Sequence, residues 1–483
     1  MRRTFLLNLL LVMGLNLLVK PFYILGIDAE VQERVGADAY GGYAALLSLS
    51  FLLNILLDLG ITNWNTRHIA QHTHLMRKHV AGILGLRVVL IALYAAVTLG
   101  AALVLGYGEG ELGLLALLVL NQALAGTLLY LRSNIAGAQR FTQDSLLSVL
   151  DRLLLIVLMG AVLWGRVGGV PVSVELFALA QTAAYAVAVL VALVLVRARA
   201  GGLRFSWKPA FQWVILRQSL PYALLILLMT VYYRIDTVML ERMLPDGALQ
   251  AGIYAQAFRF FEAINMLGFL MAGLLLPLFS RMLRAGQDVG PLTGLAFRLV
   301  WAAGLPLALI GMFHGSEVMA LRYSAHTEVS GPAFGLLMGC FVFVGITYVF
   351  GTLLTAHGDL RRLNRVAAAG VLLNVGLNLV LIPRLQVAGA AWASLVTQAL
   401  TALVQVALAL QVTRIRISAL QLASALLFTF GLVGAAWGMD LQRIALGWSA
   451  SVLLMAALPW AMLTGLLRVD ALHVARGAWR NGH

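Results

Sequence analysis

Seven ionisable residues lie inside long apolar stretches, where a charge must be either used or neutralised. They are Lys20, Asp58, Arg87, Arg234, Asp236, Arg259 and Glu262. A charged side chain in hydrocarbon costs at least about 2.5 kcal/mol and usually faces a protein interior or a water-filled cavity. Cations at several depths in a membrane would suit an anionic group that passes through it. The pattern is therefore more typical of a transporter than of an anchor.

Helix geometry separates the roles of four of these charges. Arg259 and Glu262 are three residues apart, so they share one face of a helix. Arg234 and Asp236 differ by about 200° around theirs, so only one of them can face a lumen squarely. We predict that Arg234 faces the lumen and that Asp236 makes a contact between helices or forms a coupling-ion site.

The alternative is that the charges neutralise one another. Four positive and three negative residues leave one net positive charge, and buried opposite charges commonly pair for packing reasons. Structural pairing is the favoured interpretation for Asp58, which could also cap a helix turn. The predicted substrate-binding cations are Lys20, Arg87, Arg234 and Arg259, and the predicted coupling or ion-pair carboxylates are Asp58, Asp236 and Glu262.

The composition places these charges in a polytopic membrane protein. Of 483 residues, 61% are hydrophobic and 11% are charged, and the mean hydropathy is +0.91. The single cysteine, Cys340, excludes a disulfide within one chain. A net charge of +14 would indicate nucleic acid for a soluble protein, but here it concerns the side of the membrane that holds Lys and Arg. We expect no nucleic-acid partner.

Fourteen apolar runs are long enough to cross a bilayer as helices. They cover residues 4–27, 40–61, 80–105, 112–131, 146–164, 174–196, 220–240, 251–279, 295–313, 334–355, 366–382, 388–412, 420–437 and 444–467. The fifth is the weakest, because Asp151 and Arg152 shorten its cleanly apolar part. The predicted fold class is an all-α polytopic membrane protein of two six-helix lobes, related by a pseudo-two-fold axis, plus two C-terminal helices.

The domain organisation follows from the polar segments between the runs. The predicted parts are an N-lobe at 1–196, a cytoplasmic linker at 197–219, a C-lobe at 220–412, two further helices at 413–467 and an amphipathic cytoplasmic tail at 468–483. The linker and the tail both have the composition of segments that lie on a lipid surface.

The distribution of Lys and Arg sets the orientation. With both termini in the cytoplasm, most of the 34 Lys and Arg residues fall in cytoplasmic segments. Those outside are only Arg34, Arg166, Arg242, Arg322, Arg384 and Arg443. The positive-inside rule therefore places both termini in the cytoplasm. The first apolar run leads directly into a second span without a small-residue cleavage site, so we predict that no signal peptide is removed.

An internal repeat joins the two halves. The segment YGGYAAL at 40–46 and the segment AGIYAQA at 251–257 match at Gly41 and Gly252 and at Tyr43 and Tyr254. Both pairs of positions differ by 211. Because each half has an even number of spans, the repeats are predicted to be parallel and related by an axis along the membrane normal.

Several of these segments resemble a known transporter family. SLPYALLILLMTVYYRIDTVML (219–240), AGIYAQAFRFFE (251–262) and the stretch 353–398 resemble the polysaccharide-exporter branch of the multidrug/oligosaccharidyl-lipid/polysaccharide superfamily. The best-known members of that branch are Wzx-type flippases. The segment VGADAYGGYAALLSLSFLLNILLDLGITNWNTRHIA (35–70) fits the first hairpin of the same family.

The resemblance implies a V-shaped bundle of two lobes around a central cavity, with alternating access between leaflets. The implied cargo is an undecaprenyl-pyrophosphate-linked oligosaccharide, turned to the periplasmic leaflet of a bacterial inner membrane for surface polysaccharide, O-antigen or lipopolysaccharide synthesis. The implied partners are membrane lipids, a coupling H⁺ or Na⁺, and polysaccharide polymerase machinery. The arginine-rich first helix of the lipid II flippase branch is not found, which makes lipid II a less expected cargo.

Two competing functions remain open at this point. A cation-coupled multidrug exporter of the same superfamily should have mostly acidic lumen residues. A membrane glycosyltransferase or polymerase would need acidic residues in outer loops, and only Asp28, Glu30 and Glu33 qualify, in a short loop. The histidine group at 68, 72, 74 and 79 lacks a recognised ligand spacing. We expect no enzymatic activity, no metal and no cofactor.

Overall fold

A computed structural model provides the structure of the chain. It describes residues 14–62, 65, 69, 76–138, 140–165, 169, 171–200, 209–415 and 417–467. The start of the first predicted span, three members of the histidine group (His68, His72 and His74), the side chain of the fourth (His79) and the predicted amphipathic tail lie outside the described residues.

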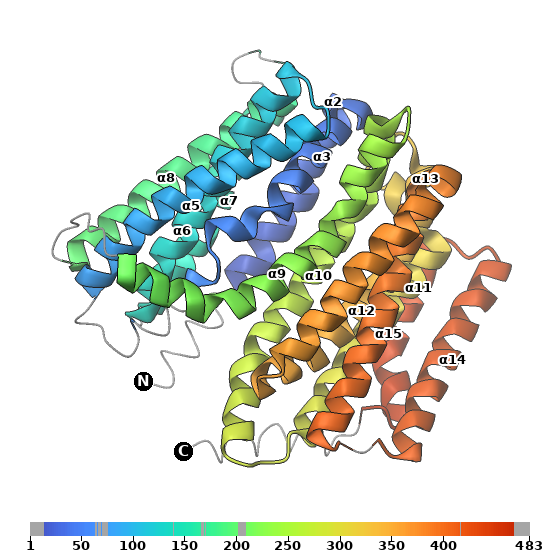
Figure 1. Cartoon of the computed structure of the whole chain (residues 1–483). Helices are drawn as coiled ribbons and strands as arrows, with labels where there is room; N and C mark the ends of the chain where they lie inside the picture. The colour runs from blue at the N-terminus through green and yellow to red at the C-terminus, as the bar shows by residue number, and fades with distance from the viewer. Residues whose placement is uncertain are drawn as a thin grey trace. The chain divides into compact units, whose positions relative to one another are not determined.

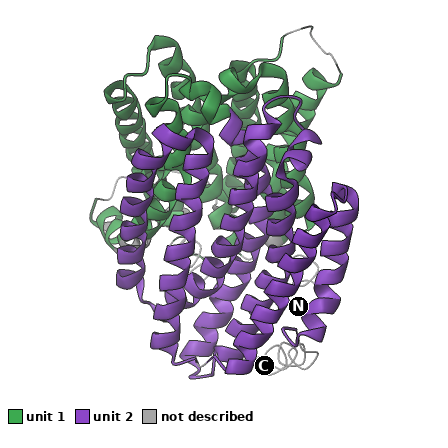
Figure 2. Ribbon diagram, turned by 90° about the vertical axis from the view of Figure 1, so that its right-hand side faces the viewer, with its two compact units in different colours: residues 1–252 green, residues 253–483 purple. Residues whose placement is uncertain are grey.

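The chain forms two compact units, Met1–Gly252 and Ile253–His483 (Figure 2). In unit 1, a helical segment at 14–22 continues into a π-helix and then further helices. These are η1 (Tyr23–Asp28), α2 (Ala29–Val35), α3 (Ala37–Leu52), η2 (Asn54–Leu57), α5 (Met76–Val104), α6 (Glu109–Gly137), α7 (Phe141–Leu163), α8 (Val174–Ala200) and α9 (Pro209–Met243).

Helix α10 (Gly247–Arg284) begins in unit 1 and continues into unit 2. The other helices of unit 2 are α11 (Gly290–Ala320), α12 (Thr327–His357), α13 (Leu360–Thr413), α14 (Ala419–Leu441) and α15 (Leu446–Leu463) (Figure 1). The described parts of the chain contain helices and no strand. The predicted all-α fold class is therefore confirmed.

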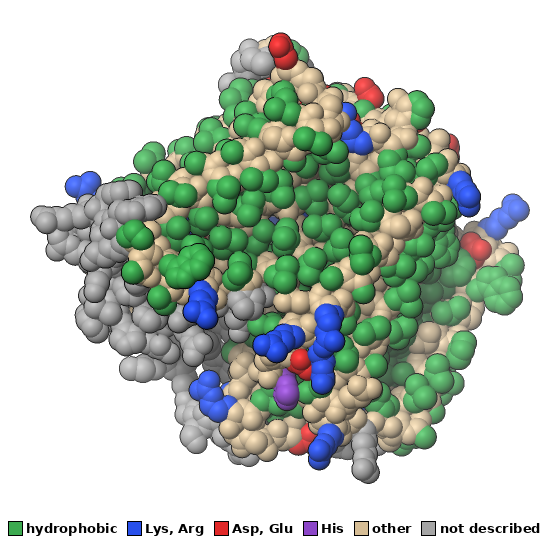
Figure 3. Space-filling view, viewed as in Figure 1, with side chains coloured by type: hydrophobic (Ala, Val, Ile, Leu, Met, Phe, Trp, Pro, Cys, Tyr) green, Lys and Arg blue, Asp and Glu red, His purple; other side chains and the backbone are tan. Residues whose placement is uncertain are grey.

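Eleven of the described helices are long and apolar enough to cross a membrane. One of them, α13, contains the two predicted spans 366–382 and 388–412, which meet at Gln386, where φ is 51°. The weak fifth span is a continuous helix, α7, which includes Asp151 and Arg152. In the space-filling view, hydrophobic side chains cover the middle of the face that α13 occupies, with several Lys and Arg side chains gathered at its lower end (Figure 3).

Two predicted segments differ from the structure. The second span is not one helix, because α3 ends at Leu52 and the chain passes through η2 to Leu59 and Gly60, which both have positive φ. Asp58 stabilises this break by accepting hydrogen bonds from the backbone N–H of Thr62. The segment that holds Asp28, Glu30 and Glu33 lies in η1 and α2 and was wrongly predicted to be a loop.

Helix α9 starts earlier than the predicted span at 220. It begins at Pro209, a residue suited to the first helical position because its missing N–H needs no partner there. It packs against α3 and α5. Near its end, the hydroxyl of Tyr107 donates a hydrogen bond to Glu241 at 2.9 Å. These contacts place α9 in unit 1, while the predicted division into two lobes stays a prediction.

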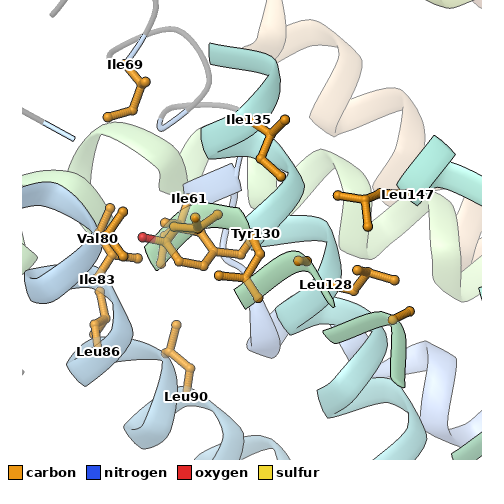
Figure 4. Close-up of a cluster of buried hydrophobic side chains, with 14 of the residues drawn as sticks. Ile61, Ile69, Val80, Ile83, Leu86, Leu90, Leu128, Tyr130, Ile135 and Leu147 are labelled. Carbon is orange, nitrogen blue, oxygen red and sulfur yellow. The ribbon is translucent and has the colours of Figure 1, made fainter. Parts of the chain in front are cut away.

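The core of unit 1 shows how the helices are held. Ile83, Leu86 and Leu90 repeat at helical spacing on α5 and join Leu128 and Tyr130 of α6 in one buried cluster (Figure 4). In unit 2 a separate cluster packs α14 and α15 against α11, with Phe428 and Leu453 fully buried. Helix α5, which carries Arg87, is therefore fixed by ordinary apolar packing.

Candidate substrate site

A pair of cations lies within the spans of unit 1. Arg152, in the middle of α7, has its guanidinium carbon 4.4 Å from the ring centre of Tyr23 and donates a hydrogen bond to the hydroxyl of Tyr185 at 2.9 Å. Its Nε lies 3.6 Å from the carboxylate of Asp151. Lys20 lies within electrostatic range of Arg152 and Asp151, and it forms no hydrogen bond or ion pair with any other residue that the structure describes.

The surroundings of this pair hold further charges that already have partners. Arg132, which also acts on Lys20, is paired with Asp144, with 2.8 Å between Nε and Oδ1. Asp28, which acts on Arg152, is buried and accepts a hydrogen bond from the hydroxyl of Tyr40 at 2.6 Å. The ammonium of Lys20 thus retains its three donors, and an anionic group beside it would gain charge-assisted hydrogen bonds.

Sequence reasoning missed Arg152 as a site residue. Arg152 was counted only against the fifth span, although an arginine beside an aspartate in an apolar run has the same character as the Arg234 and Asp236 pair. That likeness was the available signal. The aromatic partners Tyr23 and Tyr185 come from other helices, and the sequence contains no signal for them.

Arg87 is held in a buried ion pair. Only 2% of its side chain is exposed, and its Nη1 lies 3.2 Å from Oδ1 of Asp58. Its guanidinium carbon lies 5.1 Å from the ring centre of Tyr130, which belongs to the apolar cluster of Figure 4. Asp58 thus both pairs with Arg87 and caps the turn at Thr62. This geometry agrees with the structural pairing favoured for Asp58. Nε and Nη2 of Arg87 have no hydrogen-bond partner among the described residues, but they are buried.

Arg234 and Asp236 of α9 lie in different surroundings. Arg234 is partly exposed, with its guanidinium carbon 4.7 Å from the ring centre of Phe51 on α3. Asp236 is only 1% exposed. A difference of this kind is what their separation around the helix requires. The roles predicted for them, substrate contact and coupling, remain predictions.

Arg259 and Glu262 pair within unit 2. Nη1 of Arg259 lies 2.7 Å from Oε2 of Glu262, and the two residues are three apart on α10. Arg259 is 5% exposed. The shared helix face expected from their spacing thus carries an ion pair, and the positive charge of Arg259 is neutralised in this conformation.

The repeated glycines meet in unit 1. A Cβ placed on Gly41 would lie 1.7 Å from the carbonyl oxygen of Ala248, and one placed on Gly252 would lie 1.8 Å from the carbonyl oxygen of Ala37. Positions 37 and 248 differ by 211, as do positions 41 and 252. The contact is therefore reciprocal, with each copy of the repeat placing its glycine against the same backbone position of the other.

The geometry can be set beside known proteins. Residues 31–283, more than half of the chain, match the family described as polysaccharide biosynthesis protein. The chain belongs to this family. A search of curated proteins found no match.

Solved structures share the fold. The lipid II flippase MurJ, in an inward closed conformation, is 10% identical and aligns over 95% of this chain and 97% of its own, with a TM-score of 0.70. An inward-facing multidrug resistance MATE family transporter of the MOP superfamily is 15% identical over 82% of this chain and 94% of its own, with a TM-score of 0.60. A MOP superfamily transporter from Pyrococcus furiosus is 15% identical over 84% of this chain and 94% of its own, with a TM-score of 0.55.

These neighbours and the family match together confirm the resemblance stated from the sequence. The chain shares its fold with transporters of the MOP superfamily and with a lipid II flippase. At 10–15% identity the structural likeness shows the fold, so the cargo has to be argued from the residues of this chain.

Proposed function

We propose that the protein is a flippase for a lipid-linked oligosaccharide. It would move an undecaprenyl-pyrophosphate-linked glycan from the cytoplasmic to the periplasmic leaflet of a bacterial inner membrane by alternating access, in the synthesis of a surface polysaccharide such as O-antigen. Membership of a polysaccharide biosynthesis family supports a glycan cargo. The observation that carries the proposal is Lys20, an uncommitted cation inside a span beside Arg152.

A pyrophosphate suits this pair of cations. Arg152 offers a planar guanidinium whose contact with Asp151 is long, at 3.6 Å, and Lys20 offers a compact charge with three donors. Two neighbouring cations repel each other in a medium of low dielectric, and an anion between them removes that repulsion. A cationic drug would meet the same repulsion, which favours the flippase over the multidrug exporter.

Arg234 and Arg259 are the further cargo contacts that we propose. Arg234 is partly exposed, whereas Arg259 is held by Glu262. A proton or a sodium ion on Glu262 would release Arg259 to the pyrophosphate, so Glu262 and Asp236 are the carboxylates that we propose for coupling. We assign Arg87 to its structural pair with Asp58.

The membrane potential can drive the proposed step without an ion site. A membrane negative inside favours outward movement of a net negative complex by about 2.3 kcal/mol per charge per 100 mV. Proton or sodium coupling is then optional.

The test is translocation of lipid-linked glycan in vesicles that contain the purified protein. Lys20→Gln and Arg152→Gln should each slow translocation about tenfold or more, because each removes a charge-assisted hydrogen bond. Arg361→Gln, an exposed residue at the start of α13, is the matched control. Equal rates in all three variants would refute the proposal, and transport of a cationic drug instead of the glycan would favour the exporter.

A further inference from the structure

Unit 2 contains a cavity that none of the proposed cargo residues touches. Its volume is about 650 Å³, and it lies between the first turns of α11 and α14 and the C-terminal end of α13. Its apolar wall includes Leu295, Phe297, Phe350, Leu410 and Leu466. A space of this kind accepts hydrocarbon.

Two arginines line the same cavity. Arg414 follows the last turn of α13, is exposed, and makes no hydrogen bond or ion pair with another residue in the described part of the chain. Arg298, on α11, is partly buried and also lines an adjoining cavity of about 130 Å³ with Ser418 and Gln421. Cationic side chains and an apolar wall therefore share one space.

One carboxylate also lines the cavity, and it is already engaged. Oδ1 of Asp288 accepts a hydrogen bond of 2.8 Å from the backbone N–H of Gly290 at the start of α11. Among the described residues that line the cavity, two are arginines and one is a carboxylate. The complementary ligand carries a negative headgroup.

We propose that this cavity binds an anionic phospholipid, with its phosphate between Arg298 and Arg414 and an acyl chain against the apolar wall. The positive-inside rule places this end of α11, α13 and α14 at the cytoplasmic leaflet, and basic pockets between helices on that side suit anionic headgroups. A free phosphate would leave the apolar wall empty. A zwitterionic lipid would bring its own cation toward the arginines.

A lipid in this position would connect three helices of unit 2. Ile417, just before α14, and Gln421 and Leu422, in its first turn, line the cavity together with residues of α11 and α13. Elsewhere α14 contacts α11 through the apolar cluster around Phe428. Bound lipid should therefore raise the thermal stability of the protein as well as occupy the site.

The experiment uses the full chain, delipidated in detergent, and measures bound lipid by native mass spectrometry and the unfolding midpoint by a thermal assay. Phosphatidylglycerol should bind and stabilise more strongly than phosphatidylcholine with the same acyl chains. Arg298→Gln and Arg414→Gln should each weaken phosphatidylglycerol binding about fivefold, since each removes one cation near the headgroup. Arg284→Gln, an exposed arginine at the end of α10, should leave binding unchanged.

A fourth variant tests the apolar wall without changing charge. A Cβ on Gly294, which lines the cavity, would meet only Nη2 of Arg298, at 3.9 Å, so Gly294→Leu fills the space and should lower binding of both lipids. The proposal is overturned by equal binding of the two lipids, by unchanged binding in both arginine variants, or by inorganic phosphate stabilising the protein as well as phosphatidylglycerol does. Displacement of phosphatidylglycerol by undecaprenyl phosphate at equal concentration would also overturn it, because the cavity would then be a cargo site.

Discussion

The reciprocal glycine contact allows a quantitative prediction for Gly41→Ala. The added Cβ would lie 1.7 Å from the carbonyl oxygen of Ala248 and 2.6 Å from the backbone nitrogen of Gly252. Both atoms belong to backbone, so α3 and α10 must separate by more than 1 Å to restore ordinary contact. Overpacking of this kind costs about 1–3 kcal/mol. If transport opens this contact, the conformation described here should lose population about fivefold to 150-fold relative to the opened one.

The assay is the labelling rate of a cysteine at position 250 in a protein whose native Cys340 has been replaced. Gln250 is 7% exposed and lies between the two contact positions Ala248 and Gly252, so labelling should be slow in the parent and faster with Gly41→Ala. Gly42→Ala is the matched control, because nothing lies within 4 Å of a Cβ at that position. The reasoning is refuted if both alanine variants change the labelling rate and the unfolding midpoint to the same extent.

Three further predictions concern the charges and the topology. Asp58→Asn should lower the free energy of unfolding by about 3 kcal/mol, because it leaves Arg87 buried without its partner. Changing Asp58 to Leu together with Arg87 to Met should recover most of that loss in a thermal unfolding assay. A cysteine at position 166 should label from outside, whereas a cysteine at position 361 should label only after permeabilisation. The reverse result would exclude the predicted orientation. Glu262→Gln should abolish the response of glycan translocation to an imposed ion gradient while leaving the response to membrane potential; an unchanged response to both would exclude coupling through this carboxylate.

The fold was predictable because it depends on features that a sequence states directly. Fourteen apolar runs specify helices, and the all-α fold follows from them. The spacing of Arg259 and Glu262 predicted a shared face, and the structure places an ion pair there. The repeat around Gly41 and Gly252 predicted related positions, and these prove to be in contact with each other's copy.

The errors arise where a local preference overrides the apolar pattern. Hydropathy treats residues 40–61 as one span, but α3 ends at Leu52, and after η2 the carboxylate of Asp58 accepts hydrogen bonds from the backbone N–H of Thr62. Hydropathy likewise treats 28–35 as a loop, although the acidic and basic residues there form a helical pair, Glu30 with Arg34 at 2.8 Å.

The candidate site was the least predictable part, since a charge count treats all internal cations alike. Arg87 and Arg259 each have a carboxylate partner at 3.2 and 2.7 Å, so the excess of basic over acidic residues does not identify them as cargo contacts. Lys20 differs from them because it forms no ion pair with a described residue. Arg152 differs because its partners are the Tyr185 hydroxyl at 2.9 Å, the ring of Tyr23 and a carboxylate 3.6 Å away. Arg87 also leaves Nε and Nη2 without a hydrogen-bond partner, but it is only 2% exposed. What marks a cation for an anionic cargo is therefore unused hydrogen-bonding capacity that the cargo can reach, and both properties depend on neighbours from other helices. The sequence places each residue along its helix, but it does not place those neighbours.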